Sequence, residues 1–177
     1  MKQKYLFHLS YLWLCLVAGL SVAQAGDIPK GYRGFYAAPD GAWQLQLKES
    51  EALWRTTGET LKLPVVRDTP AKIYAKLRQE KSGIYLAEPE KSALQMTAFG
   101  VIFNEEKSPA PAGGLTWRRA TVFYLTLNRE QSNPVSNLDF ILSGDGLVTL
   151  DTLNNTWQIG WGPNATRATL QRTEKNP

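Results

Sequence analysis

Cysteine and histidine are almost absent from this chain of 177 residues, which has one of each. Both of them, His8 and Cys15, lie in the first 25 residues, and that segment has the pattern of a secretory signal. A protein that has lost the segment has no thiol and no imidazole. This absence excludes a cysteine nucleophile, a serine nucleophile activated by histidine, a histidine general base, and the usual zinc, copper or haem sites.

The amino-terminal segment shows the three parts of a signal peptide. Lys2 and Lys4 provide positive charge, an uncharged leucine-rich run follows, and the small-x-small motif Ala23-Gln24-Ala25 comes next. We therefore expect residues 1–25 to be removed as a signal peptide. The apolar run is short for a membrane span of about 20 residues, so no stable membrane anchor is expected. The leader is of a bacterial type, which predicts an exported protein, periplasmic or secreted.

The remaining chain, residues 26–177, has a weak net charge. Removal of Lys2 and Lys4 leaves 18 basic against 16 acidic residues, a net charge of +2. With both signs interspersed, this balance gives no basis for binding nucleic acid. A length of 152 residues predicts a single domain. Because no disulfide can form within it, its stability must come from apolar burial, to which its 15 aromatic residues contribute most.

Most of the mature chain alternates between apolar and polar residues with a period of two, which indicates half-buried strands. In one clear example, Trp43, Leu45 and Leu47 alternate with glutamine and lysine. Gly144-Asp145-Gly146 is interpreted as a turn between two strands. The further predicted strands cover residues 33–38, 83–87, 93–103, 115–127, 138–143, 147–152, 156–161 and 165–173.

The longest predicted strand covers residues 115–127. Its apolar face includes Trp117, Phe123 and Leu125, and polar residues stand mainly on the other face. Arg119 interrupts the pattern because it falls on the apolar side. Two interpretations are open, a β-bulge or an arginine that reaches into a lumen.

Residues 69–80 are compatible with two structures. Thr69-Pro70 followed by Ile73 and Leu77 resembles the start of a capped helix. The apolar residues between positions 71 and 77 also alternate with lysine, tyrosine and arginine, as in a strand. We favour the strand and keep the helix as the alternative.

Many short strands with little helix predict an all-β fold that must hide its edge strands. We expect residues 26–177 to form a single-domain antiparallel up-and-down β-barrel, with a two-sheet β-sandwich as the alternative. Gly34-Phe35-Tyr36, and Asp40-Gly41-Ala42-Trp43 leading into an alternating strand, are similar in style to exported lipocalin-like barrels. That resemblance implies a barrel fold, and it includes no motif that is diagnostic of the class.

The aromatic residues provide the candidate site. Alternation places four tryptophans on inward faces, where a tyrosine joins them and an arginine adds a polar group. A Trp-lined barrel interior suits a small amphipathic or apolar ligand, such as an acyl chain or a sugar, and needs no cofactor. The same rings could simply fill the core, so a structural role is the alternative. The candidate ligand-binding residues are Tyr36, Trp43, Trp117, Arg119, Trp157 and Trp161.

Two other functions remain compatible with the sequence. An envelope protein partner or an inhibited enzyme could bind through loops such as residues 104–114, which are rich in proline and glycine. A hydrolase could use the carboxylates of Asp139, Asp151 and Glu59, because paired carboxylates perform acid–base chemistry without histidine. The acidic residues lack the spacing of a calcium loop, so no metal site is expected. The oligomeric state is left open.

Overall fold

A computed structural model describes residues 28–87, 94–104 and 112–174. The predicted leader, residues 1–25, lies outside these ranges, as does most of the predicted 104–114 loop. No helix within them is both long and apolar enough to cross a membrane. The elements are η1 (Lys30–Tyr32), β1 (Gly34–Ala37), β2 (Trp43–Leu47), β3 (Glu51–Thr56), β4 (Thr60–Asp68), α1 (Pro70–Arg78), β5 (Gly83–Ala87), β6 (Gln95–Phe103), β7 (Leu115–Asn128), β8 (Asn137–Asp151), β9 (Thr156–Gly160) and β10 (Thr166–Thr173).

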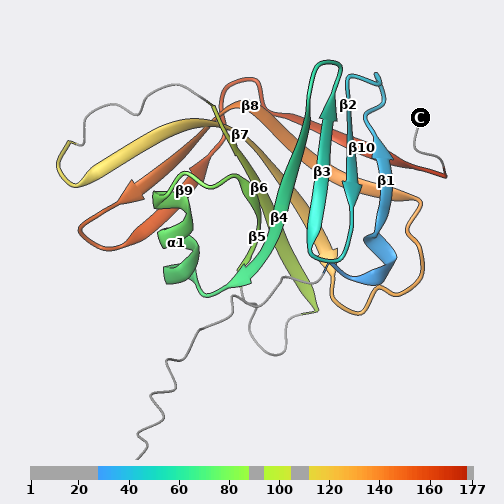
Figure 1. Cartoon of the computed structure of the whole chain (residues 1–177), viewed down its shortest axis with the longest axis horizontal. Coiled ribbons are helices and arrows are strands. Elements are labelled where there is room, and N and C mark those ends of the chain that lie inside the picture. The colour runs from blue at the N-terminus through green and yellow to red at the C-terminus, as the bar shows by residue number, and fades with distance from the viewer. Residues whose placement is uncertain (1–27, 88–93, 105–111, 175–177) are drawn as a thin grey trace, which may run out of the picture.

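Nine of the ten strands in the described ranges form a closed barrel (Figure 1). Strands β1 to β8 pair in sequence order, and β10 closes the cylinder by pairing with both β1 and β8. Closure removes the exposed sheet edges that would otherwise pair with other chains. The barrel predicted from the sequence is therefore confirmed. It is mixed rather than wholly antiparallel, because β4 and β5 run parallel.

Helix α1 is the crossover that connects these two parallel strands, as parallel pairing requires. Pro70 occupies its first turn, where a missing N–H removes no helical hydrogen bond. Ile73, Tyr74 and Leu77 form its buried stripe. The strand favoured for residues 69–80 is therefore wrong. Ile73 and Leu77 are four residues apart, which satisfies a period of two and a helical turn equally well.

Strands β3 and β4 are not among the predicted strands, although buried and less buried residues alternate in much of both. Ala52 and Trp54 of β3, and Leu63 and Val65 of β4, point into the barrel. Pro64 obscures the pattern, because proline is rare within paired strands. Val65 N–H points to the β3 side and donates at 2.9 Å to the carbonyl of Ser50, the residue that precedes β3. The neighbouring Pro64 nitrogen therefore faces the other side of β4, where pairing with β5 begins only at Val65.

Strand β8 is one strand of 15 residues, although the sequence predicts two strands with a turn at Gly144-Asp145-Gly146. This segment is a β-bulge, because two residues of β8 lie opposite Thr121 of β7. The buried Ser143 hydroxyl stabilises it by donating to Asp145 Oδ1 at 2.7 Å and accepting from Gly162 N–H at 2.9 Å. Before the bulge β8 pairs with β10, and after it β8 pairs with β9.

Beyond the bulge, the sheet leaves the barrel as a three-stranded extension that we call the wing. It consists of residues 115–119 of β7, residues 147–151 of β8, and β9. Helix α1 packs between one face of the wing and the outer wall of β5 and β6 (Figure 1). A hydrophobic core forms beneath the helix. It contains Ile73, Tyr74, Leu77, Tyr85, Phe99, Val101, Ala120, Val122, Val148 and Leu150.

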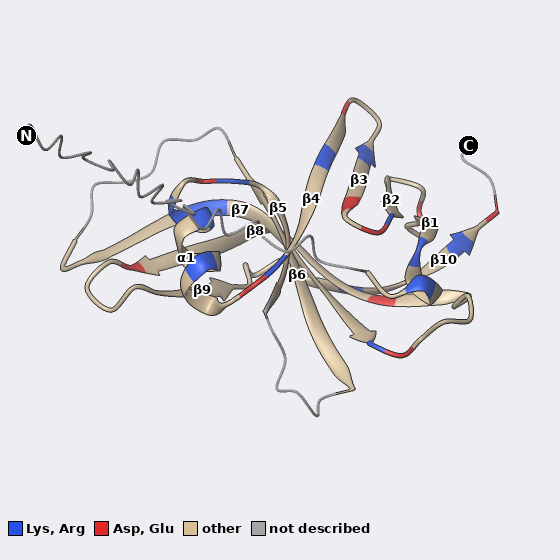
Figure 2. Ribbon diagram, turned by 60° about the horizontal axis from the view of Figure 1, so that its bottom comes forward, with Lys and Arg blue, Asp and Glu red and all other residues tan. Residues whose placement is uncertain are grey.

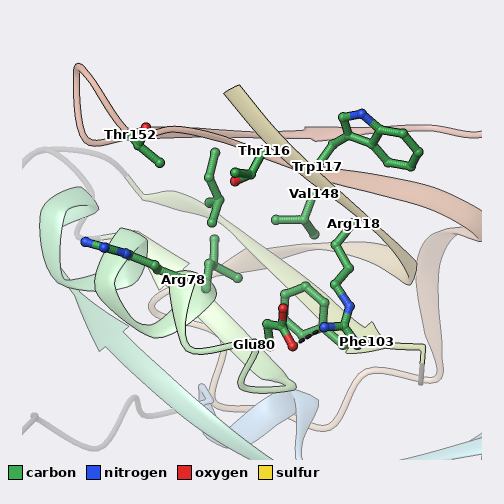
Figure 3. Close-up of a pocket in the computed structure, with 10 residues that line it drawn as sticks. Arg78, Glu80, Phe103, Thr116, Trp117, Arg118, Val148 and Thr152 are labelled. Atoms are coloured by element: carbon green, nitrogen blue, oxygen red, sulfur yellow. Dashed lines mark ion pairs between the residues drawn. The ribbon is translucent and has the colours of Figure 1, made fainter. Parts of the chain in front are cut away.

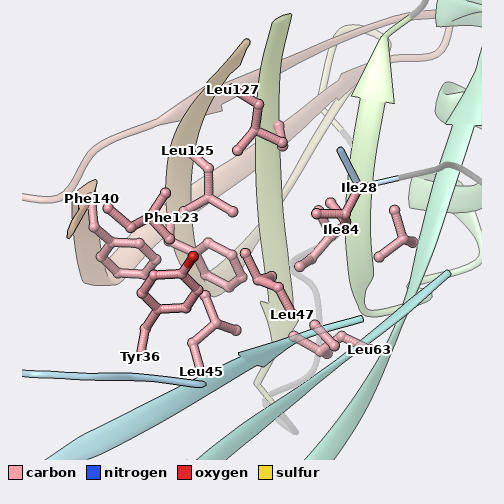
Figure 4. Close-up of a cluster of buried hydrophobic side chains, with 14 of the residues drawn as sticks. Ile28, Tyr36, Leu45, Leu47, Leu63, Ile84, Phe123, Leu125, Leu127 and Phe140 are labelled. Carbon is pink, nitrogen blue, oxygen red and sulfur yellow. The ribbon is translucent and has the colours of Figure 1, made fainter. Parts of the chain in front are cut away.

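A separate hydrophobic core fills the barrel lumen (Figure 4). Trp43 and Trp54 stack with ring centroids 4.5 Å apart, and Trp54 stacks on Phe123 at 5.4 Å. Phe140 contacts all three of these rings, with centroids between 4.8 and 6.2 Å. Gly100 of β6 makes room for the stack, because a Cβ there would lie 1.9 Å from Phe123 Cζ. The rings thus lie where facing strands leave space for them.

We expect Gly100→Ala to destabilise the protein by about 1–3 kcal/mol, because the added methyl group must displace the Phe123 ring. The matched control is Gly58→Ala. A Cβ at position 58 meets nothing within 4 Å, so the change should stay within about 0.5 kcal/mol. Urea unfolding of the two variants and the parent measures both. Equal effects of the two substitutions would contradict this account of Gly100.

Because of Tyr85, in the core beneath α1, we expect the protein to become less stable in alkaline solution. Burial raises the pKa of Tyr85 from 10.0 to about 12, and its hydroxyl donates to the Lys81 carbonyl. The folded protein thus retains this proton more tightly than the unfolded chain. This difference in pKa contributes to the free energy of unfolding. The contribution is complete below pH 10 and is lost as the pH rises towards 12, by an amount on the order of 2–3 kcal/mol.

Tyr85→Phe should cost about 1 kcal/mol at neutral pH through the lost hydrogen bond. It should then lose less stability than the parent as the pH rises. Burial also raises the pKa values of Tyr36 and Tyr124, so part of the alkaline loss should remain. Unfolding free energies measured in urea at about pH 8 and about pH 11 compare the two proteins. Parallel pH profiles would show that Tyr85 ionisation is not coupled to unfolding.

Candidate ligand-binding site

One end of the barrel is closed by the first described residues. Ile28 is fully buried in the lumen core, and η1 follows it at the same end. Gly31 N–H donates to the Gln131 carbonyl at 2.8 Å, and Val135 N–H donates to the Gly31 carbonyl at 3.0 Å. These bonds join η1 to the connection between β7 and β8, so the segment covers this end of the lumen.

Arg172 of β10 stabilises the closed end. Its guanidinium donates to the carbonyls of Gly31 at 3.0 Å, Val135 at 3.3 Å and Arg33 at 2.5 Å. It also lies 6.0 Å from the centre of the Tyr36 ring. Burial raises the pKa of Tyr36, and the charge of Arg172 partly offsets that increase. One cation thus satisfies three main-chain acceptors from two segments, η1 with its C-cap and the β7–β8 connection, and so fixes η1 against β10.

The opposite end of the barrel has a cavity of about 600 Å³. We call it the mouth notch. It lies between the start of β4 and the end of β6. A second recess at this end has a volume of about 290 Å³ and is lined by Trp43, Leu142 and Ala168. Residues lining the mouth notch include Trp54, Glu59, Leu61, Ser82, Ile102 and Thr121.

The mouth notch exists because β5 is shorter than the strands on either side of it. β4 pairs with β5 only from Val65 onward, and β6 pairs with β5 only as far as Val101. Within the described ranges, no strand lies between the first half of β4 and the last two residues of β6. Ser82 occupies part of this gap, where its hydroxyl accepts a hydrogen bond from Phe103 N–H at 3.0 Å.

The mouth notch has an aromatic floor and a polar rim. Trp54 is only 6% exposed, and the half-buried Trp43 stacked on it separates the notch from the second recess. Glu59, Ser82 and Thr121 place a carboxylate and two hydroxyls around the opening, and Thr56, Lys62 and Asn104 add further polar groups. The apolar part of the lining consists of Trp54, Leu61, Leu63, Ile102 and Phe103. This arrangement suits a ligand with an apolar part and a polar head.

Two of the six candidate residues lie in the barrel as the sequence predicts. Trp43 lines the second recess at the open end. Tyr36 is fully buried near the closed end, where its hydroxyl donates to the Tyr32 carbonyl at 2.9 Å. Side chains of the lumen core separate Tyr36 from the open end. The structure therefore does not bring these two residues into one cavity.

Trp117 and Arg119 do not face the lumen, which corrects their expected placement. They share a strand face with Phe123, as the alternation indicates, but that face is inside the barrel only in the second half of β7. Both residues belong to the wing, where the same face is open to solvent: Trp117 is 45% exposed and Arg119 is exposed. The bulge lies in β8 at the bend, and not at Arg119.

Trp157 and Trp161 lie outside the barrel, which corrects a second expectation. Strand β9 pairs only with the wing part of β8. Trp157 packs on Phe99 with centroids 4.8 Å apart and donates from Nε1 to the Pro70 carbonyl at 3.1 Å. Trp161 packs on Tyr124 at 4.6 Å. They share one side as predicted, but that side faces α1 and the outer wall of the barrel.

Trp54 is missing from the candidate residues, although it lies at the centre of the aromatic stack. Its strand was not predicted, so its inward face could not be assigned. The alternation of Ala52 and Trp54 with the charged Glu51 and Arg55 contained the signal, which the apolar Leu53 weakened. The presence of Leu61 and Leu63 on the next strand supports the same face.

The three carboxylates considered for hydrolysis do not form a pair at one site. Asp139 and Asp151 lie twelve positions apart on β8 itself, on opposite sides of the β-bulge: Asp139 is in the part paired with β10, and Asp151 is in the part paired with β9. Asp151 instead caps the β8–β9 turn, where hydrogen bonds from Asn154 lower its pKa. Glu59 lies at the mouth notch. No group of three potential metal ligands occurs in the part of the chain that the structure describes.

These features define a closed, mixed β-barrel with one plugged end, one open end and an external helix. Comparison with protein-family models, with curated proteins and with solved structures finds no match to this chain. Function is therefore inferred from the geometry of the barrel itself.

Arg172→Met should lower the free energy of unfolding by about 2–4 kcal/mol, because three carbonyls lose a charged donor. Arg167→Met is the matched control on the same strand, since Arg167 is exposed and its replacement should change stability by less than about 0.5 kcal/mol. Urea unfolding monitored by circular dichroism measures both. If the two variants unfold alike, Arg172 does not stabilise the closed end.

Proposed function

We propose that this protein is an exported, non-catalytic binding protein that takes a small amphipathic or apolar ligand into the open end of its barrel. The observation that carries the proposal is the mouth notch, a cavity of about 600 Å³ floored by Trp54 and rimmed by Glu59, Ser82 and Thr121. Small-molecule sites typically have volumes of about 300–1,000 Å³. The notch is within this range.

The packing of the barrel limits how deeply the ligand enters. Below the Trp43–Trp54 pair the lumen is filled by buried side chains, and η1 and Arg172 close the far end. The ligand site is thus confined to the mouth, and its apolar part ends on the indole of Trp54. The polar head stays at the rim, where Glu59 is exposed to solvent. A short apolar chain or a single sugar-sized ring fits this depth better than a long chain.

The predicted leader belongs to the same proposal. In the periplasm or the extracellular space the barrel must be stable without a disulfide, and the aromatic rings buried in its lumen supply that stability. Native mass spectrometry of protein purified from its own envelope should show a small molecule that is released on unfolding.

Octyl glucoside, a neutral amphiphile used below its micelle concentration, is a direct probe of the mouth notch. We expect it to shift the tryptophan emission of the parent saturably, because Trp54 and Trp43 lie at the open end. Thr121→Phe should weaken this binding at least about tenfold by filling the notch. Thr126→Phe is the matched control. Thr126 lies on the same strand and is exposed, and its side chain is on the face of β7 opposite to that of Thr121.

The outcome separates blocking from unfolding. Both variants should keep the circular dichroism spectrum of the parent, and Thr126→Phe should keep its affinity. A parent that shows no saturable response, or a Thr121→Phe protein that binds octyl glucoside as well as the parent, would overturn the proposal.

A further inference from the structure

A second cavity lies outside the barrel, between the carboxyl end of α1 and the wing (Figure 3). Its volume is about 340 Å³, and we call it the helix–wing cleft. Leu77, Val148 and Leu150 form apolar walls, and Thr116 adds a hydroxyl. An ion pair between Arg118 and Glu80 lies at one end of the cleft, beside the ring of Phe103.

Arg118 is placed as an anion-binding side chain. It is only 16% exposed, and its carbon Cζ lies 5.8 Å from the centre of the Phe103 ring. One terminal nitrogen pairs with Glu80, and the other donates to the Asn104 carbonyl at 2.6 Å. Its buried Nε has no hydrogen-bond partner among the described residues. A guanidinium has five N–H donors, so this cation has donor capacity that the described residues do not use.

Glu80 occupies a position that disfavours glutamate. It follows Gln79, the C-cap of α1, and has φ of 55°, in the left-handed region where helices usually end with glycine. Its negative charge also lies at the negative end of the helix dipole. Glu80 N–H donates to the Leu77 carbonyl at 2.9 Å, so the backbone of the helix end fixes this conformation. The result is a carboxylate, 45% exposed, that is directed at Arg118.

We propose that the helix–wing cleft binds an amphipathic monocarboxylate, whose carboxylate takes the place of Glu80 on Arg118. The apolar tail lies along Leu77, Val148 and Leu150. Glu80 acts as an internal competitor: it neutralises the buried guanidinium when the cleft is empty, and its exposure allows it to move into solvent when the ligand arrives. A neutral amphiphile that displaced Glu80 would leave the guanidinium without an anionic partner, so it is not an adequate ligand.

The charges around the cleft favour an anion. Helix α1 has three basic residues and no acidic residue, and Figure 2 shows the basic residues along it. Lys72 of this helix pairs with Asp68 at 3.2 Å, whereas Arg78 lies at the cleft itself. The cleft is distinct from the mouth notch, because Thr116 and Arg118 point to the outer face of β7 and Thr121 points to the lumen.

Octanoate tests the proposal by isothermal titration calorimetry, with octanol and octylamine as probes that share its tail. We expect octanoate alone to bind the cleft of the parent. Glu80→Gln should tighten octanoate binding about three- to tenfold, because the internal competitor is lost. Arg118→Gln should weaken it at least about tenfold. Thr116→Phe, which fills the cleft without changing the ion pair, covers the case in which Arg118→Gln fails to fold.

Thr121→Phe separates this site from the mouth notch, since it should leave octanoate binding unchanged while it removes octyl glucoside binding. The proposal is overturned if Glu80→Gln binds octanoate no more tightly than the parent, or if octanol binds as well as octanoate to Thr121→Phe, in which the mouth notch is filled. It is also overturned if Thr116→Phe leaves octanoate binding intact. In each of those cases the Arg118–Glu80 pair only attaches α1 to β7.

Discussion

Phe123, Trp54 and Trp43 form one stack that joins strands β7, β3 and β2 across the lumen. A cylinder of nine strands encloses more space than aliphatic side chains fill easily, and the stack occupies that space near the open end. It also sets the depth of the mouth notch, because the indole of Trp54 is both a core residue and the cavity floor. Stability and the depth of the mouth notch therefore depend on the same rings.

The parallel pairing of β4 with β5 has two consequences for the outside of the barrel. The crossover requires a helix, and α1 covers the outer wall of β5 and β6 together with one face of the wing. It also makes β5 short, since the chain re-enters the sheet only at Gly83. The mouth notch and the helix–wing cleft thus have one origin, and Phe103 lies at the edge of both.

The barrel was predictable because most strands alternate strictly, and alternation reports which residues share a face. It does not report what covers that face. Trp117 shares a face with Phe123 yet lies in the wing, and Trp157 and Trp161 share a face that packs on the outer wall. The spacing of Ile73 and Leu77 fits both the period of a strand and the period of a helix. Only the parallel pairing of β4 with β5 shows that a helix lies between them. Pro64 made the regular strand β4 hard to recognise from the sequence. Only the structure shows that the proline nitrogen lies on the side of β4 that has no partner strand at this position.

The pairing of β10 with β1 determines when the fold can form. Phe35 lies opposite Thr173, and Arg172 binds the carbonyls of Gly31 and Arg33, so the first strand is completed only by the last. Such contacts between distant segments make folding slow. A chain synthesised from its amino terminus remains an open sheet until its final strand is available. For the export that we propose, this delay keeps the barrel unclosed while the polypeptide is threaded across a membrane.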